Sequence, residues 1–168
     1  ENKTGETQMA DLLALSRSVI DEGKGTAETG PLNRITHELS EIGDGVAMVE
    51  AFSHSIVFRT DDGLVAFDTS NEGGGSKAVK AIRGWSPDRF NTIVYTHGHI
   101  DHVGGCGAYV HDCEACRAPA PRIVGHENVQ KRFERYNLTN GYNMVINERQ
   151  FGQFKKRGYD LAGTAHFL

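Results

Sequence analysis

Apolar and polar residues follow two different periods along the chain, and these periods predict its elements. Near the N-terminus, residues 9–21 place Leu, Val and Ile on one helical face, and a pair of glycines ends the helix. A linker rich in Gly, Thr and Pro follows, and from about Ile35 the pattern changes to short β-prone runs. We therefore predict a helix and linker over residues 1–34 and one domain over residues 35–168.

Two turn triplets predict a pair of β-hairpins. The triplets are Gly43-Asp44-Gly45 and Asp61-Asp62-Gly63, and both combine residue types that tolerate the positive φ of tight hairpin turns. The flanking apolar runs are residues 39–42 and 46–52 in the first hairpin and residues 55–60 and 64–68 in the second. The domain is therefore expected to begin with antiparallel strands.

The pattern then changes to alternating helices and strands. A helix is expected over 76–83, after three glycines and before Gly84 and Pro87, and a β-branched apolar run at 92–96 suits an interior strand covered on both faces. Further elements are expected as helices near 107–116 and 126–136 and a strand at 122–124. Together these elements predict a mixed α/β (α+β) fold.

Composition and charge exclude several classes of function. The net charge of -4 is spread over both signs, and no run of Lys or Arg forms a stripe for nucleic acid. No apolar stretch approaches the roughly 20 residues that span a bilayer, and the N-terminus lacks a secretion signal, so we expect a soluble, cytoplasmic protein. The chain opens at Glu1 without Met, and processing or truncation at either end stays open.

Three cysteines lie close together, at Cys106, Cys113 and Cys116. The pair Cys113-x-x-Cys116 has the spacing of a redox or zinc-knuckle motif, but no second such pair accompanies it. Reduced thiols are the favoured interpretation, and the role of these cysteines stays open.

The segment with the most chemical content is His97-x-His99-x-Asp101-His102, between the predicted interior strand and Gly104-Gly105. Imidazole nitrogens and carboxylate oxygens are zinc ligands, and a loop at a strand end can turn alternate side chains toward one point. We predict that His97 and His99 face one metal ion and that Asp101 and His102 face a second. Surface or capping histidines are the alternative, and manganese or iron would accept the same ligands.

This motif resembles the signature of the metallo-β-lactamase superfamily. The resemblance covers about residues 36–136 and includes Asp68, at the end of a predicted strand, and the segment Val124-Gly125-His126-Glu127. It implies an αββα sandwich, of which this chain supplies the N-terminal half behind a helical extension. It also implies that Asp68 orients a histidine ligand by accepting its other N–H, the alternative being a turn residue.

The family requires three more ligands from later strands: a His for each metal and a bridging carboxylate. Of the remaining histidines, His166 lacks the expected surroundings and is interpreted as a terminal residue, and His126 as part of a helix start. His37, His54 and His111 follow no pattern. A homo-oligomer or a second chain that completes the site therefore stays an open alternative.

The resemblance implies a metal-dependent hydrolase that uses two zinc ions to activate water, with Asp101 in the catalytic centre. His99 occupies a position where the redox branch of the family has glutamate. Residues 141–152 are similar to a stretch of the alkyl-sulfatase-like branch, which implies that Asn143 and Arg149 approach an anionic small-molecule substrate. Sulfate esters are the leading substrates; lactone, ester or β-lactam hydrolysis, and an incomplete fragment without turnover, are the alternatives.

Overall fold

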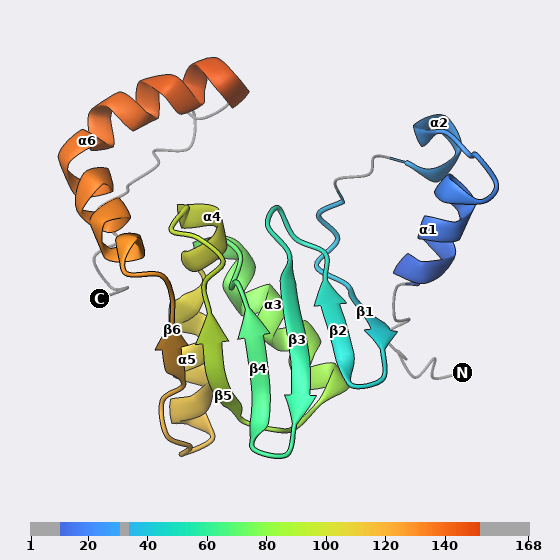
Figure 1. The fold of residues 1–168 in the computed structure, drawn as a ribbon, viewed down its shortest axis with the longest axis horizontal. Coiled ribbons are helices and arrows are strands. Elements are labelled where there is room, and N and C mark those ends of the chain that lie inside the picture. Colours follow the sequence, from blue (N-terminus) through green and yellow to red (C-terminus); the bar gives the residue numbers. More distant parts are fainter. Residues whose placement is uncertain (1–10, 31–33, 152–168) are drawn as a thin grey trace, which may run out of the picture.

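The computed structural model describes residues 11–30 and 34–151, which form one six-stranded sheet and its helices (Figure 1). The strands are β1 Leu39–Gly43, β2 Val46–Val49, β3 Ser55–Thr60, β4 Gly63–Phe67, β5 Phe90–Val94 and β6 Arg122–Val124. The helices are α1 Leu12–Ile20, α2 Thr26–Thr29, α3 Glu72–Trp85, α4 Ile100–Val103, α5 Cys106–Ala115 and α6 Asn128–Phe151. This is the mixed α/β architecture that the sequence predicts.

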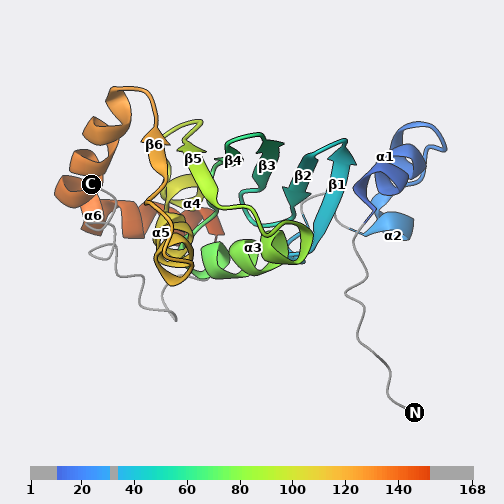
Figure 2. The same cartoon turned by 90° about the horizontal axis from the view of Figure 1, so that it is seen from below.

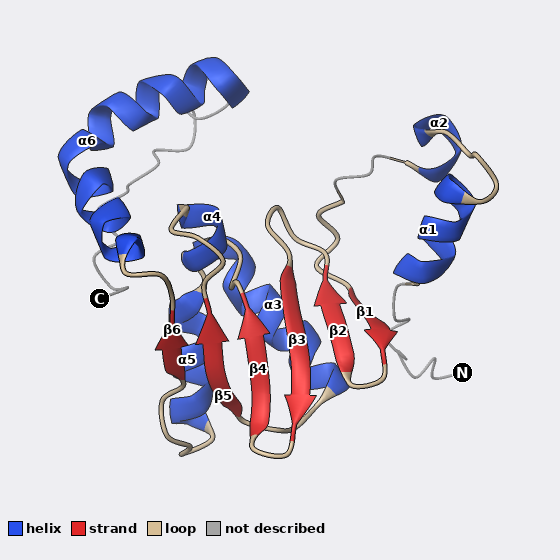
Figure 3. Cartoon of the chain, viewed as in Figure 1, coloured by secondary structure: helices blue, strands red, loops and turns tan. Residues whose placement is uncertain are grey.

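The strands follow one another across the sheet in chain order, from β1 to β6 (Figure 3). The first four are antiparallel, and tight turns join β1 to β2 and β3 to β4, which confirms both predicted hairpins. The pairs β4·β5 and β5·β6 are parallel, because α3 and the α4–α5 segment carry the chain back to the opposite edge. The carboxyl ends of β4, β5 and β6 therefore lie along the same edge of the sheet.

Helices α3 and α5 cover one face of the sheet (Figure 2). The strand residues that point toward them are fully buried, including Val57, Leu64 and Ala66. On the helical side, Ile82 and Tyr109 are also fully buried. Buried and less buried positions therefore alternate along these strands, as expected where helices cover one face of a sheet.

The opposite face of the sheet is apolar as well, although its side chains stay partly exposed in the described part of the chain. Phe58 and Phe67 meet edge to face with ring centroids 5.4 Å apart, and Phe58 is 37% exposed. Ile56 and Val65 share this face and are half-buried. Apolar side chains on both faces are typical of a sheet with a layer on each side, as in the αββα sandwich.

Four segments differ from the sequence prediction. Helix α3 includes the glycines at 73–75 and 84, which were expected to lie just outside it. Helix α2 lies within the predicted linker, and residues 100–103 of the motif form the short helix α4, where a loop was expected. Helix α6 continues to Phe151 past a kink at Thr139, beyond the expected end at 136. Its later apolar residues whose side chains are described stay exposed, Leu138 by 86%, so no buried stripe marked that part in the sequence.

The segment before the sheet is attached through a buried carboxylate. Glu50, at the end of β2, is 1% exposed and pairs with Arg34, with 2.8 Å between Oε1 and Nε. The hydroxyl of Thr36 donates to Glu50 Oε2 at 3.0 Å. The boundary between the N-terminal helix and linker and the domain, placed between residues 34 and 35, stays a prediction.

In the described residues, no helix has the length and apolar character needed to cross a bilayer.

Candidate metal-binding site

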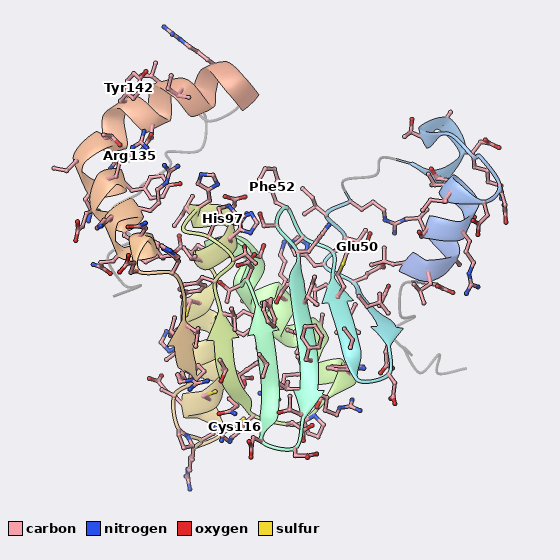
Figure 4. The ribbon with its side chains drawn as sticks, viewed as in Figure 1. Glu50, Phe52, His97, Cys116, Arg135 and Tyr142 are labelled. Atoms are coloured by element: carbon pink, nitrogen blue, oxygen red, sulfur yellow. The ribbon has the colours of Figure 1, made fainter. Side chains whose placement is uncertain are left out.

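The four motif side chains lie where β5 ends, at the carboxyl edge of the parallel strands. His97 follows the strand, His99 is the N-cap of α4, and Asp101 and His102 belong to that helix. In Figure 4, His97 lies at the same end of the sheet as Phe52, which belongs to the loop between β2 and β3. The short helix replaces the expected loop, yet it keeps consecutive motif residues within reach of one another.

The imidazoles and the carboxylate converge. His97 Nε2 lies 2.9 Å from His99 Nδ1, and the rings of His97 and His102 have centroids 4.0 Å apart. His102 Nε2 lies 3.5 Å from Asp101 Oδ2. The structure therefore brings all four predicted residues together at one point of the sheet edge.

The nitrogen pair of His97 and His99 fits a zinc ion with a small adjustment. Two ligands of a tetrahedral zinc ion with Zn–N bonds of about 2.05 Å lie roughly 3.3 Å apart, a few tenths of an ångström more than the observed 2.9 Å. Among the described residues, no group of three or more His, Cys, Asp or Glu side chains is arranged to hold one ion. The predicted ligand roles therefore stay predictions, and the described residues do not supply a complete coordination shell.

The carboxylate of Asp68 makes three hydrogen bonds to residues in and beside the motif. Its Oδ1 accepts the Thr96 N–H at 2.9 Å, and its Oδ2 accepts the Thr96 hydroxyl at 2.6 Å. The same Oδ2 lies 2.7 Å from His102 Nδ1, so a proton on Nδ1 leaves Nε2 of His102 with a free lone pair. The contact needed to orient His102 is present, and its effect on a metal ion is a prediction.

The backbone at Asp68 adopts a conformation that most residues avoid. Its φ is 57°, and Ser70 has a φ of 63°. Such left-handed residues cost energy and are held by surrounding contacts. Here the Thr69 N–H donates to the carbonyl of His102 at 2.7 Å, and the Gly105 N–H donates to that of Ser70 at 2.9 Å. The turn after β4 is thus bound directly to the motif segment.

The close approach of these two segments requires glycine at position 105. A Cβ built on Gly105 would lie 2.0 Å from the Thr69 carbonyl oxygen and 2.7 Å from the Gly75 Cα. We expect Gly105→Ala to lower the free energy of unfolding by about 3 kcal/mol or more, because both neighbours are backbone atoms that cannot rotate away. Urea unfolding followed by circular dichroism measures the change.

Gly107 provides the matched control for this prediction, since a Cβ there meets no atom within 4 Å. Because Gly107 lies in helix α5, Gly107→Ala should raise the stability by up to about 1 kcal/mol. Equal stability of the two alanine variants would contradict the close backbone contact at position 105.

Ser53 is a site residue that the sequence analysis missed. Its hydroxyl donates to Asp101 Oδ2 at 2.6 Å, and its residue is 6% exposed. Ser53 comes from the loop between β2 and β3, far from the motif in sequence. A single serine after a strand carries no signal of its own, so only the fold reveals this contact.

A pocket of about 390 Å³ opens beside the two histidines. It is lined by residues 96–99 at the end of β5 and by His126, Asn128, Val129 and Arg132 from the start of α6 and the residues before it. Arg132 is the second residue that the sequence analysis missed.

The pKa of His99 is lowered, mainly by burial and then by the positive charges of Arg132 and His97, whereas the carboxylate of Asp101 acts to raise it. His99 therefore favours its neutral form, which has a lone pair for a metal ion.

The remaining candidates lie outside this cluster. Asn143 donates to the Thr139 hydroxyl at 2.9 Å, Arg149 is exposed, and neither lines the pocket, so their role toward a substrate stays a prediction. His126 accepts the N–H of Asn128 at the start of α6, as expected of a helix start. His166 lies outside the described residues.

The other histidines and the cysteines have local partners or positions away from the motif. His54 accepts the Ala51 N–H, and His111 pairs with Glu114 on the exposed side of α5. Cys106 and Cys113 are buried, and Cys116 is exposed. Figure 4 shows Cys116 at the end of the sheet opposite His97, so the cysteine pair and the motif are separate features.

Comparisons with solved structures find similarity to parts of longer proteins. A double mutant of the sec-alkyl sulfatase PisA1 is 22% identical with a TM-score of 0.55, and the match covers 68% of this chain and 19% of that one. A metallo-β-lactamase with a HARLDQ motif from Cronobacter sakazakii is 17% identical with a TM-score of 0.49, over 61% of this chain and 36% of that one. The chain thus spans well under half the length of these structures. At such identities the likeness to PisA1 shows the fold alone.

The sequence family agrees with this fold. No curated protein matches the chain. The model of the metallo-beta-lactamase superfamily, however, matches residues 48–149, which is more than half of the chain and includes the motif, Asp68 and most of α6. The chain belongs to the metallo-β-lactamase superfamily.

Proposed function

We propose that this chain carries four of the seven ligands of a metal-dependent hydrolase with two zinc ions. His97 and His99 would hold the first ion, and Asp101 and His102 the second. The observation that supports this most directly is the convergence of the four side chains, together with the hydrogen bond from His102 Nδ1 to Asp68. Two such ions, when bound, lower the pKa of a shared water molecule and polarise the bond that it attacks.

The residues around the motif would hold its ligands in place. Asp68 would fix the proton of His102 on Nδ1, and Ser53 donates to Asp101 Oδ2, the oxygen that lies 3.5 Å from His102 Nε2. Asp101 would act in the catalytic centre as a carboxylate ligand of the second ion. Such outer contacts fix the tautomer and orientation of ligands, and removing them typically weakens metal binding.

The further ligands that two zinc ions need are proposed to come from outside the described residues. The same polypeptide, or a second copy of it, would provide them. The alternative that this chain alone is an incomplete, inactive fragment is favoured by the lack of any three-ligand group among the described residues.

A small-molecule sulfate ester is the proposed substrate, with lactones, other esters and β-lactams as rivals. The fold is shared with the sec-alkyl sulfatase PisA1, and the described residues that line the pocket beside His97 and His99 include an arginine and no carboxylate. A guanidinium group suits the oxygens of sulfate, because it donates two parallel hydrogen bonds.

Zinc content tests the proposal before any substrate is known. We expect about two zinc ions per chain in the purified protein, and a clear loss in His97→Ala, because that change removes a ligand nitrogen. His111→Ala is the matched control, since His111 is exposed on α5 and should leave the zinc content unchanged. If the protein binds no zinc even after the metal is added, the result would instead support the alternative that this chain is an incomplete, inactive fragment.

Hydrolysis assays then separate the substrates. A sulfate ester, a lactone and nitrocefin are offered to the zinc-loaded protein. Cleavage of the sulfate ester is the expected result, and cleavage of the lactone with the sulfate ester untouched would overturn the substrate assignment.

A further inference from the structure

The pocket beside the motif has one permanent positive charge. Among the described residues that line it, Arg132 is the only Lys or Arg, and none is Asp or Glu. His97 and His99 form one side of the pocket, so a group bound there would lie next to the proposed first metal ion. A pocket with this charge selects for anions over neutral groups.

The side chain of Arg132 is held in one orientation. Its stem packs on Gly98, where an added Cβ would lie 3.0 Å from the Arg132 Cβ and 3.1 Å from its Cγ. Its guanidinium lies 4.8 Å from the centre of the Tyr136 ring and donates to the Tyr136 hydroxyl at 3.3 Å. An arginine ordered in this way loses little further entropy when it binds a ligand.

The donors of Arg132 are mostly unused. Within the described residues no carboxylate forms an ion pair with it, and its Nε is buried without a hydrogen-bond partner. A guanidinium has five N–H donors, and a buried donor left unpaired is unfavourable. For comparison, Arg83 binds both oxygens of Asp112. Arg132 therefore has two parallel donors for a pair of oxygens, and no carboxylate among the described residues occupies them.

We propose that Arg132 is an anion-binding residue that selects substrates with an oxyanion group beside the bond to be hydrolysed. The shared chemistry is a pair of negatively charged oxygens, from a sulfate ester or from a carboxylate on a lactam. This inference rests on the proposed hydrolase function and adds the specificity residue to it. If Arg132 instead only packs α6 against the motif, its charge and its parallel donors have no effect on binding.

The test compares two variants. Arg132→Met keeps the aliphatic part of the side chain but removes the charge, and Arg132→Lys keeps the charge but removes the two parallel N–H donors of the guanidinium group. Arg135→Met is the matched control, because Arg135 is exposed on the same helix and is labelled in Figure 4. Inorganic sulfate is titrated into the zinc-loaded proteins by calorimetry. KM and kcat are measured for a sulfate ester, for nitrocefin, which carries a carboxylate, and for a neutral lactone.

We expect Arg132→Met to weaken sulfate binding about tenfold or more, which is the usual effect of losing a charge-assisted hydrogen bond. KM for each anionic substrate that the enzyme cleaves should rise by a similar factor, with kcat and the lactone less affected. If KM rises only for the sulfate ester, the site binds sulfate oxygens, and if KM rises only for nitrocefin, the site binds a carboxylate. Arg132→Lys should lose part of the affinity, and Arg135→Met none.

The proposal would be overturned if Arg132→Met bound sulfate as tightly as the unmodified protein. It would also be overturned if KM for the neutral lactone rose as much as KM for the anionic substrates. If no protein in the series cleaves any substrate, the hydrolase proposal fails, and the sulfate titration still decides the role of Arg132. If Arg132→Met does not fold, Arg132→Lys decides: unchanged sulfate affinity in that variant overturns the role of the two parallel donors.

Discussion

Asp101→Ala is expected to reduce bound zinc from about two ions per chain to about one and to lower hydrolysis more than about 100-fold. Outer partners of metal ligands typically contribute 10- to 100-fold, so loss of a ligand itself should exceed that range. The change also leaves the Ser53 hydroxyl without its acceptor. Zinc content by atomic emission and initial rates on the preferred substrate measure the two effects.

The control for this variant is Asp61→Ala. Asp61 lies in the exposed turn between β3 and β4, so the same loss of a carboxylate there should change neither zinc content nor rate. Retention of two zinc ions in Asp101→Ala would show that Asp101 is not a ligand, and a different carboxylate would have to take its place.

Asp68→Asn is expected to lower zinc affinity 10- to 100-fold while the chain still folds. Asparagine tolerates the left-handed backbone at this position, where φ is 57°, so the change isolates the carboxylate. An amide has only one oxygen to accept hydrogen bonds, and it cannot serve the Thr96 N–H, the Thr96 hydroxyl and His102 Nδ1 together. Competition with a zinc chelator measures the affinity.

A second measurement separates orientation of the ligand from general loosening of the fold. Nitrogen NMR of the imidazoles should show His102 protonated on Nδ1 in the unmodified protein and a mixture of tautomers in Asp68→Asn. Asp62→Asn, in the exposed turn after β3, is the control for loss of charge. Unchanged zinc affinity and an unchanged His102 tautomer would contradict the role of Asp68.

The sequence predicted the elements that have a local signal. The triplets at 43–45 and 61–63 indicate their hairpins, because tight turns depend on the residues within them. The apolar runs that flank these turns predicted β2, β3 and β4, and one face of each strand is buried. The later part of α6 was missed because its apolar residues are exposed and leave no periodic stripe.

The residues of the candidate site also fall into two groups, those that the sequence indicated and those that only the structure revealed. Three histidines and an aspartate within six residues indicate metal chemistry without any knowledge of the fold. Ser53 and Arg132 carry no such signal, because each is a single residue of a common type. Their importance depends on their distances from Asp101 and from the pocket, and these are long-range properties of the structure.

By itself, therefore, the sequence determined the hairpins, the helix and strand that follow them, the motif and the superfamily. Only the tertiary structure decided which side chains surround the motif. The parallel register that pairs Phe67 with Val94 sets the ends of β4 and β5 side by side, so Asp68 meets Thr96 and His102. The physical reason is that turns and periodicity arise from neighbours in sequence, whereas a hydrogen bond between two loops requires strands that are already paired.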